Sequence, residues 1–234
     1  LSIDHTEVIL GPGSVVYGSD AIGGVMNFYT KKPQFTQDSM VFSGNALIRY
    51  ATANNENTAH LDFNYGTSKF AAATSISINS FGDLKMGSHG PDEYLRNQYV
   101  DRRNGQDVMV DTNNPEKQIP TGYDQINLLQ KFRYKLNQSW EFDLGLIYTA
   151  TGNYSRYDVL TRFNDTGDLR FAQWYYGPQK WFMANAKAIH RGNGKWYDKM
   201  IFSQSYQKFE ESRNNRSFQE AKLFQSKEQV DVHT

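Results

Sequence analysis

Residues 7–28 read EVILGPGSVVYGSDAIGGVMNF, and this glycine-rich stretch decides how the rest of the chain is interpreted. It places five glycines and one proline within residues 11–24 and then continues as an alternating run. Glycine is used where the backbone needs a positive φ or a close approach to another backbone. Gly11-Pro12-Gly13 therefore predicts a tight turn, and Gly23-Gly24 predicts a second close approach before a β-strand.

The glycine pattern does not fit the common nucleotide-binding motifs. A phosphate-binding loop needs Gly-Lys-Ser or Gly-Lys-Thr after its glycines, and neither follows here. Gly11-Pro12-Gly13 also lacks the third glycine of a dinucleotide-binding fingerprint, and no helical pattern follows it. The simplest alternative is a glycine-rich loop in a soluble domain.

The stretch closely resembles the end of the plug domain of TonB-dependent outer-membrane receptors, which lies just before the chain enters the β-barrel. Leu10 departs from the family pattern, because an arginine is usual at this position. Any polar contact of that arginine inside the plug is therefore not expected here. The close match covers about the first 32 residues. The residues that carry the motif are Gly11, Pro12, Gly13, Tyr17, Gly18, Asp20, Gly23, Gly24 and Asn27.

Composition excludes several classes of protein. The 234 residues contain no cysteine, which excludes a disulfide framework and a cysteine metal site. The 25 basic and 25 acidic residues balance, so no basic footprint for a nucleic acid is present. No apolar run approaches the length of a transmembrane helix, but strands of a membrane barrel alternate and average out as polar. The chain starts at Leu1 and ends within a strand-like run, from which we expect an internal segment of a longer chain.

Period-two alternation dominates the chain after residue 38. In the run that contains Leu61 and Phe63, the intervening His60 and Asp62 face the other way. Short turns are expected near residues 67, 138 and 193, long polar stretches at 82–122 and 152–178, and a break at 214–216. The alternating runs are residues 39–50, 59–65, 70–79, 126–136, 140–148, 181–190, 196–206 and 218–232.

The order of the connections distinguishes a membrane barrel from a large soluble sandwich. Consecutive hairpin connections lie at opposite ends of an antiparallel sheet, so the tight turns fall at one end and the long loops at the other. Outer-membrane barrels have this asymmetry, whereas a sandwich explains only the alternation. The sequence therefore predicts an all-β fold, a transmembrane antiparallel barrel of which about eight strands are present.

The resemblance implies a domain division and a function. Residues 1–33 would be the end of the plug, residues 34–38 a linker and residues 39–234 the first part of a barrel of 22 strands. The family imports a nutrient across the bacterial outer membrane: an iron–siderophore first, or haem, cobalamin or a glycan. Its partners are TonB, with ExbB and ExbD, acting through an N-terminal box that is not in these residues, and outer-membrane lipid and lipopolysaccharide.

The sequence offers no catalytic or metal-binding set, and no cofactor is expected. The five histidines lack metal-ligand spacing, and Ser14 does not stand in a Gly-x-Ser-x-Gly elbow. An enzyme is therefore not expected. An outer-membrane adhesin or a barrel enzyme without a transport role is the alternative.

The two long polar stretches carry the candidate binding residues. Aromatic and arginine side chains on exposed loops are typical of binding surfaces. Alternatively, these loops pack only on each other and on lipopolysaccharide. The candidates are Tyr94, Arg96, Tyr99, Tyr154, Arg156, Tyr157, Arg162, Trp174, Tyr175 and Tyr176.

Overall fold

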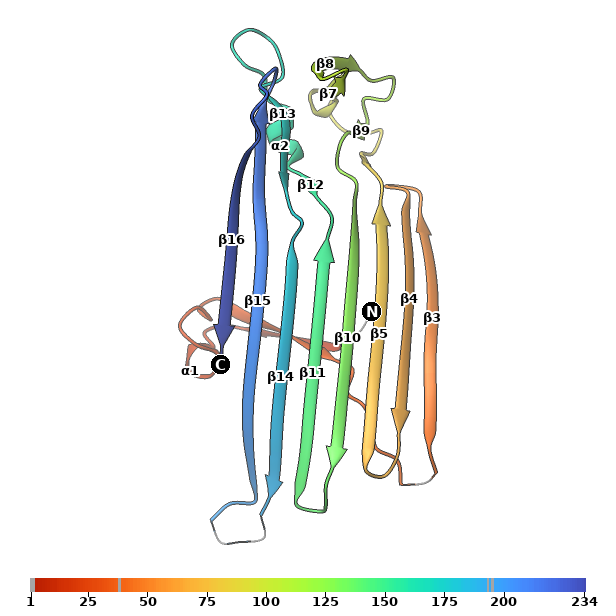
Figure 1. Ribbon diagram of the computed structural model, residues 1–234, viewed down its shortest axis with the longest axis vertical. Coiled ribbons are helices and arrows are strands. Elements are labelled where there is room, and N and C mark those ends of the chain that lie inside the picture. The colour runs from red at the N-terminus through yellow and green to blue at the C-terminus, as the bar shows by residue number, and fades with distance from the viewer. Residues whose placement is uncertain (1–2, 38, 193, 195) are drawn as a thin grey trace.

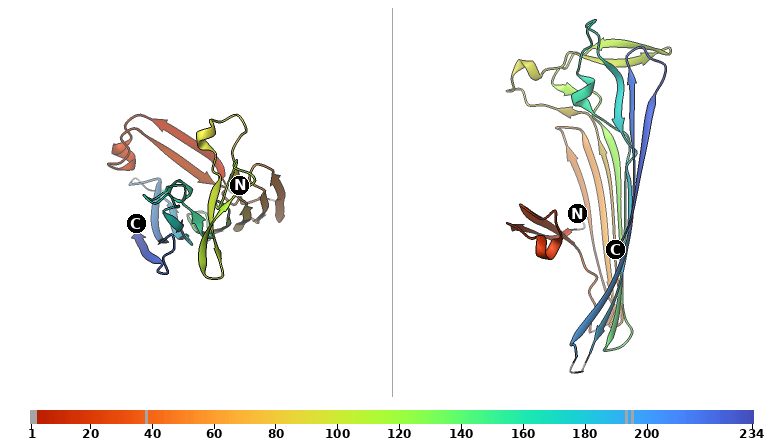
Figure 2. Two further views of the ribbon diagram at one scale, coloured as in Figure 1. Left: turned by 90° about the horizontal axis from the view of Figure 1, so that it is seen from above. Right: turned by 90° about the vertical axis from the view of Figure 1, so that its left-hand side faces the viewer.

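The computed structural model describes residues 3–37, 39–192, 194 and 196–234, which form a small N-terminal hairpin and one large antiparallel sheet (Figure 1). The hairpin consists of β1 (Ile3–Leu10), α1 (Ser14–Tyr17) and β2 (Gly24–Thr30). Figure 2 shows the hairpin against one face of the sheet, near the middle of the long axis. This face is called the inner face below, and the opposite one the outer face.

Glycines close the hairpin as the sequence predicts. Gly24 has a φ of 154°, and a β-carbon there would lie 2.8 Å from the carbonyl oxygen of Ile9. The connection folds back on itself, since the Gly11 amide donates to the Gly23 carbonyl at 3.3 Å and the Gly13 amide to Ala21 at 2.9 Å. Gly24 is thus the position where the pairing of β1 with β2 requires glycine.

In the described part of the chain, eight long strands form the body of the sheet, as expected. Every neighbouring pair is antiparallel. The shorter β13 continues the line of β14 and pairs with the upper half of β15. The long strands are β3 (Val41–Ala51), β4 (Glu56–Gly66), β5 (Phe70–Phe81), β10 (Tyr123–Lys135), β11 (Trp140–Thr151), β14 (Lys180–Arg191), β15 (Lys199–Ser217) and β16 (Phe224–His233).

The two faces of the sheet differ in polarity, because successive side chains of a strand point to opposite faces. Buried polar side chains lie on the inner face, among them Thr58, His60, Asp62, Ser75, Ser77 and Glu141. Large apolar side chains lie exposed on the outer face, among them Ile48, Leu61, Phe63, Ile76, Ile78, Phe142, Leu144, Phe182 and Phe202. A polar interior and an apolar exterior are the arrangement of a membrane barrel wall.

Both long connections, residues 82–122 and 152–179, emerge at the upper end of Figure 1, called the loop end below. The connections 67–69 and 136–139 lie at the other end, as predicted. The predicted turn near residue 193 includes residues 193 and 195, which lie outside the described residues. The expectation that every tight turn falls at the other end is wrong, because the turn at residues 52–55 lies at the loop end. The two ends of the sheet therefore differ in loop length, because both long connections lie at the loop end.

The two long polar connections contain short strands and helical turns of their own. The first contains β6 (Leu84–Lys85), η1 (Asp92–Tyr94), β7 (Gln98–Arg103), β8 (Gln106–Asp111) and β9 (Lys117–Gln118). The second contains β12 (Tyr154–Ser155), α2 (Tyr157–Leu160) and β13 (Phe171–Tyr176). Among the described residues, no helix has both the length and the apolar composition that crossing a membrane requires.

The predicted break at residues 214–216 is wrong, because β15 continues through it to Ser217. Asn and Arg there suggested a turn, but both side chains are buried and have partners. The Asn214 amide donates to Ser212 at 2.9 Å, and the Arg216 guanidinium pairs with Asp107. The turn comes later, where Gln219 has a φ of 66°.

Candidate functional site

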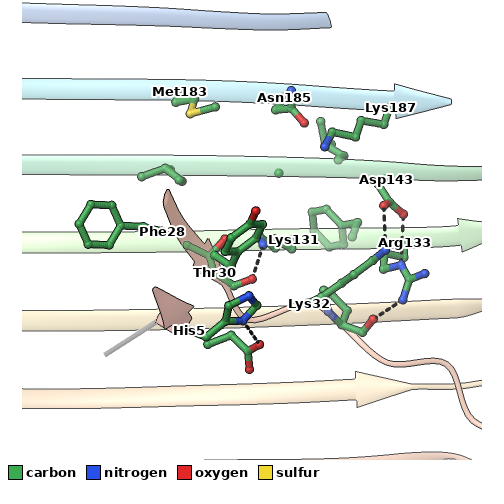
Figure 3. A pocket seen from close by; sticks show the side chains of 17 residues that line it. His5, Phe28, Thr30, Lys32, Lys131, Arg133, Asp143, Met183, Asn185 and Lys187 are labelled. Carbon is green, nitrogen blue, oxygen red and sulfur yellow. Dashed lines mark hydrogen bonds and ion pairs between the residues drawn. The ribbon is translucent and has the colours of Figure 1, made fainter. Parts of the chain in front are cut away.

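The segment that follows the hairpin is fixed to the inner face through its main-chain carbonyls. Lys131 Nζ on β10 donates to the Thr30 carbonyl at 3.0 Å, and the Arg133 guanidinium donates to the Pro33 carbonyl at 2.6 Å. Figure 3 shows both side chains reaching from the wall to the segment. Because carbonyls accept these bonds, the contact fixes the path of the backbone.

Arg133 is the centre of a charge network at this contact. Its guanidinium pairs with Glu141 and, at 3.2 Å, with Asp143, both on β11. Lys32 approaches the same Asp143 carboxylate at 3.7 Å, and the guanidinium lies 4.5 Å from the ring centroid of Phe35. The network therefore joins β10 and β11 to Lys32 and Phe35, which lie before and after Pro33.

A second contact holds Lys31, whose ammonium lies 3.2 Å from Asp62. His60 bonds to Ser77 Oγ at 2.8 Å and to Asp62 at 3.3 Å, which is the hydrogen-bond order of a Ser-His-Asp triad. The sequence did not reveal this row, because Ser77 comes from the neighbouring strand. Ser77 and His60 are buried, and Asp62 also accepts from Asn45 at 3.0 Å. The row therefore acts as an anchor for Lys31.

A cavity of about 590 Å³ lies between the hairpin and the wall (Figure 3). His5 and Phe28 line it from the hairpin, and Asn185 and Lys187 line it from β14. In the part of the chain that the structure describes, no group of three or more His, Cys, Asp or Glu side chains could hold a metal ion.

The motif residues of the hairpin serve backbone geometry. Gly11 and Gly18 have φ values of 94° and 99°. Asn27 donates to the Tyr17 hydroxyl at 3.2 Å, which ties α1 to β2. Leu10, where the resemblance expects arginine, is 85% exposed. The remaining motif residues, Pro12, Gly13, Asp20, Gly23 and Gly24, lie in the connection or at its junction with β2.

Five aromatic rings follow one another on the inner face at the loop end, and we call them the aromatic arc. Tyr123 shares the inner face with Lys131, since an even number of residues separates them along β10. The arc crosses four strands, β5, β10, β12 and β13. The ring centroids are separated by 4.9 Å (Phe81–Tyr123), 5.9 Å (Tyr123–Tyr154), 5.6 Å (Tyr154–Tyr176) and 5.0 Å (Tyr176–Trp174).

Two arginines lie on the arc. The Arg156 guanidinium carbon is 5.0 Å from the Trp174 ring centroid, and that of Arg213 is 5.7 Å from the Tyr176 ring centroid. A double hydrogen bond to Asp158, at 3.1 and 3.2 Å, orients Arg156 and raises its pKa. Planar cations stacked on aromatic faces can receive a planar, negatively charged ligand.

Burial raises the pKa of Tyr154 further above its ordinary value. Its neutral phenol can donate a hydrogen bond. The structure thus brings four of the ten loop candidates together: Tyr154, Arg156, Trp174 and Tyr176.

The other six candidates lie apart from the arc. Tyr94 is exposed in η1, Tyr99 lies on β7, and Arg162 is exposed near Asp158. Arg96 donates to the carbonyls of Glu93 and Leu95, but its buried Nε has no partner among the described residues. In Tyr157, which begins α2, burial raises the pKa. Tyr175 follows Trp174 on β13 and therefore faces the opposite way.

Sequence reasoning missed three residues of this wall: Phe81, Tyr123 and Arg213. Phe81 ends a long strand and Tyr123 begins one, so each borders the first long loop without being part of it. Their position at strand ends next to that loop was the available signal. Arg213 was overlooked because β15 was expected to end near it.

Comparisons with known proteins agree with this architecture, although no family model matches the chain. The iron-regulated outer membrane virulence protein of Vibrio cholerae is 46% identical over 61 residues, which is 26% of this chain and 8% of that protein. The vitamin B12 transporter BtuB of Vibrio vulnificus is 25% identical over 165 residues, or 70% of this chain and 21% of that protein. The chain thus spans less than a quarter of the length of these curated relatives.

Among solved structures, the ferric enterobactin receptor PfeA of Pseudomonas aeruginosa (mutant Q482A, in complex with enterobactin) aligns with 97% of this chain and 32% of its own. The TM-score is 0.53 at 14% sequence identity, a likeness of fold. The hairpin motif and the polar inner and apolar outer faces are consistent with the outer-membrane proteins to which this chain is similar. The chain is therefore similar to receptors and transporters of the bacterial outer membrane, in keeping with the resemblance of its hairpin to the plug of TonB-dependent receptors.

Proposed function

We propose that the whole protein imports an iron–siderophore complex across the outer membrane, driven by TonB with ExbB and ExbD. In this proposal residues 1–33 form the end of the plug, residues 34–38 the linker, and residues 39–234 the first part of the barrel wall. The apolar outer face meets membrane lipid, and lipopolysaccharide surrounds the loop end. The proposal assigns no catalytic role to the row of Ser77, His60 and Asp62.

The observation that carries the proposal is the hairpin anchored across the inner face. Lys31, Lys32 and two carbonyls tie the hairpin's exit to three strands of the wall, β4, β10 and β11. The two lysines are partly exposed and Asp62 is buried, so the ion pairs and the main-chain hydrogen bonds together hold this segment against the wall. An obstacle held in this way closes the interior to free diffusion, so passage of a nutrient requires an energy source.

The aromatic arc supports an iron chelate with catecholate groups as the ligand. Such a chelate is negatively charged and presents flat aromatic rings. Arg156, which is paired with Asp158, and Arg213, which is paired with Glu211 and Glu228, supply guanidinium groups. Tyr154, Trp174 and Tyr176 supply stacking surfaces at the entrance to the interior. The relatives named for iron regulation and for ferric enterobactin point to the same class of ligand.

Cobalamin is the second candidate, favoured by the alignment with a vitamin B12 transporter over 70% of the chain. Its flat corrin ring could also stack on the arc.

Uptake in cells separates these proposals. Cells that produce the whole protein, and lack other receptors for both ligands, would receive radiolabelled ferric enterobactin or cyanocobalamin, with and without TonB. We expect TonB-dependent uptake of the iron label alone. Uptake of cyanocobalamin alone would select the second candidate. Equal uptake of the iron label with and without TonB would contradict active import.

A further inference from the structure

Asp107, at the tip of the β7–β8 hairpin, ties the first long loop to a distant part of the sheet. Its carboxylate accepts two hydrogen bonds from the Arg216 guanidinium, at 2.5 and 2.8 Å, and one from the Gln219 amide at 2.9 Å. The Gln219 side chain also donates to the Asp107 carbonyl at 3.3 Å. The Asp107 side chain is 1% exposed and that of Arg216 is 5% exposed, so this ion pair is shielded from solvent.

The β7–β8 hairpin also holds the second long loop. The Leu169 amide donates to Met109 Sδ at 3.4 Å, and Leu169 is buried at this contact. The connections 82–122 and 152–179 and the β15–β16 turn therefore meet at one hairpin. Figure 2 shows this hairpin extending beyond the sheet, away from the N-terminal hairpin.

The hairpin covers the back of the strand that carries the arc. On β13, Trp174 and Tyr176 face the arc, while Gln173 and Tyr175 face the other way. A cavity of about 320 Å³ borders β13, and Gln173, Trp174 and Tyr175 line it together with Asp107 and Arg216. Because β12 pairs only with the last two residues of β13, the rest of this strand has a regular neighbour on one side, β15.

We propose that Asp107 is a positioning residue for ligand binding. Through Arg216 and Gln219 it fixes the β7–β8 hairpin behind β13, and so holds Trp174 and Tyr176 in the arc. The effect on ligand rests on the proposed function, whereas the effect on β13 does not.

The test uses the whole protein with Asp107→Asn, which removes the charge and keeps the shape. Asp107→Glu keeps the charge in a longer side chain. Asp101→Asn is the matched control, since Asp101 is an exposed carboxylate of the same hairpin that pairs with Arg103. The measurements are hydrogen exchange of the amides of residues 171–176, and the KM and Vmax of ferric enterobactin uptake at equal receptor abundance.

We expect Asp107→Asn to speed exchange across residues 171–176 at least tenfold and to raise KM about tenfold, with Vmax unchanged. Asp107→Glu should recover part of both effects, and Asp101→Asn should match wild type. A fall in Vmax at constant KM would overturn the proposal, because a general loss of function would explain it. Unchanged exchange in residues 171–176 would also overturn it.

Hydrogen exchange of residues 171–176 is measured without ligand. It therefore tests whether Asp107 positions β13 even if the wild-type protein takes up no ferric enterobactin. In that case faster exchange with no uptake would reject the proposed function and retain the role of Asp107 in the fold. If Asp107→Asn fails to insert, Arg216→Lys replaces it. That variant keeps the buried charge and loses the double hydrogen bond, and should raise exchange and KM by smaller factors. Wild-type values for Arg216→Lys would overturn the proposal.

Discussion

Gly24 is the position where a single methyl group should loosen the N-terminal hairpin. A β-carbon there would lie 2.8 Å from the Ile9 carbonyl, at a φ of 154°. The disfavoured backbone costs about 1 kcal/mol or more, and the contact with a main-chain atom about 1–3 kcal/mol. Gly24→Ala should therefore destabilise the closed hairpin by about 2–4 kcal/mol, which raises its open fraction roughly 30- to 1000-fold.

Cells offer a direct readout of this loosening. We expect Gly24→Ala to leave the barrel inserted, because the ladder of the wall does not include the hairpin. Uptake of the nutrient should fall, and sensitivity to vancomycin, a large antibiotic that the outer membrane excludes, should rise. Gly23→Ala is the matched control, since a β-carbon at Gly23 meets no described atom within 4 Å. Equal vancomycin sensitivity of the two variants at equal abundance would refute the reasoning.

Three further predictions concern the wall and the loops. Arg133→Met should leave the buried Glu141 with Arg191 as its remaining cationic partner and should lower the unfolding temperature measured by gel shift; an unchanged temperature would contradict this. A spin label at Leu144 on the outer face should be accessible to oxygen, which dissolves in lipid. A spin label at Lys187 on the inner face should be accessible to a water-soluble nickel complex. The reverse accessibilities would contradict the assignment of the two faces. Arg216 lowers the pKa of Asp107 below its usual value near 3.9. Its stabilisation is therefore complete above that value and lost as the pH falls through the lowered pKa. Protease protection of residues 98–111 should persist at pH 5 and weaken only below the usual carboxyl value near 3.9, and loss already at pH 5 would contradict this.

The alternation of apolar and polar residues with a period of two made most strands of the wall predictable. The barrel strands alternate between apolar and polar residues, and a slip by one residue would move an apolar set such as Leu61 and Phe63 to the polar face. The eight strands and the side of the long loops followed from this pattern alone. The prediction failed at residues 214–216, because polar side chains that normally favour turns are satisfied there by Gly177, Ser212 and Asp107.

The site was predictable only in part, because its contacts join distant segments. Aromatic and arginine residues marked the second long loop, and Tyr154, Arg156, Trp174 and Tyr176 do meet. Their partners Phe81 and Tyr123 come from strand ends, where strand pairing decides the neighbours. The Asp107–Arg216 pair spans 109 residues of sequence, and no local pattern announces it.

Ligand binding to the aromatic arc is the most direct test of the account. The dissociation constant of ferric enterobactin would be measured on the purified whole protein, as wild type and as Trp174→Ala. Loss of a central aromatic anchor costs about 1–2 kcal/mol or more, so we expect binding to weaken about tenfold or more. Trp196→Ala is the control, because Trp196 is 95% exposed at the other end of the sheet, and it should bind as wild type. Unchanged affinity of Trp174→Ala, or equal losses in both variants, would contradict the assignment of the arc as the ligand-binding wall.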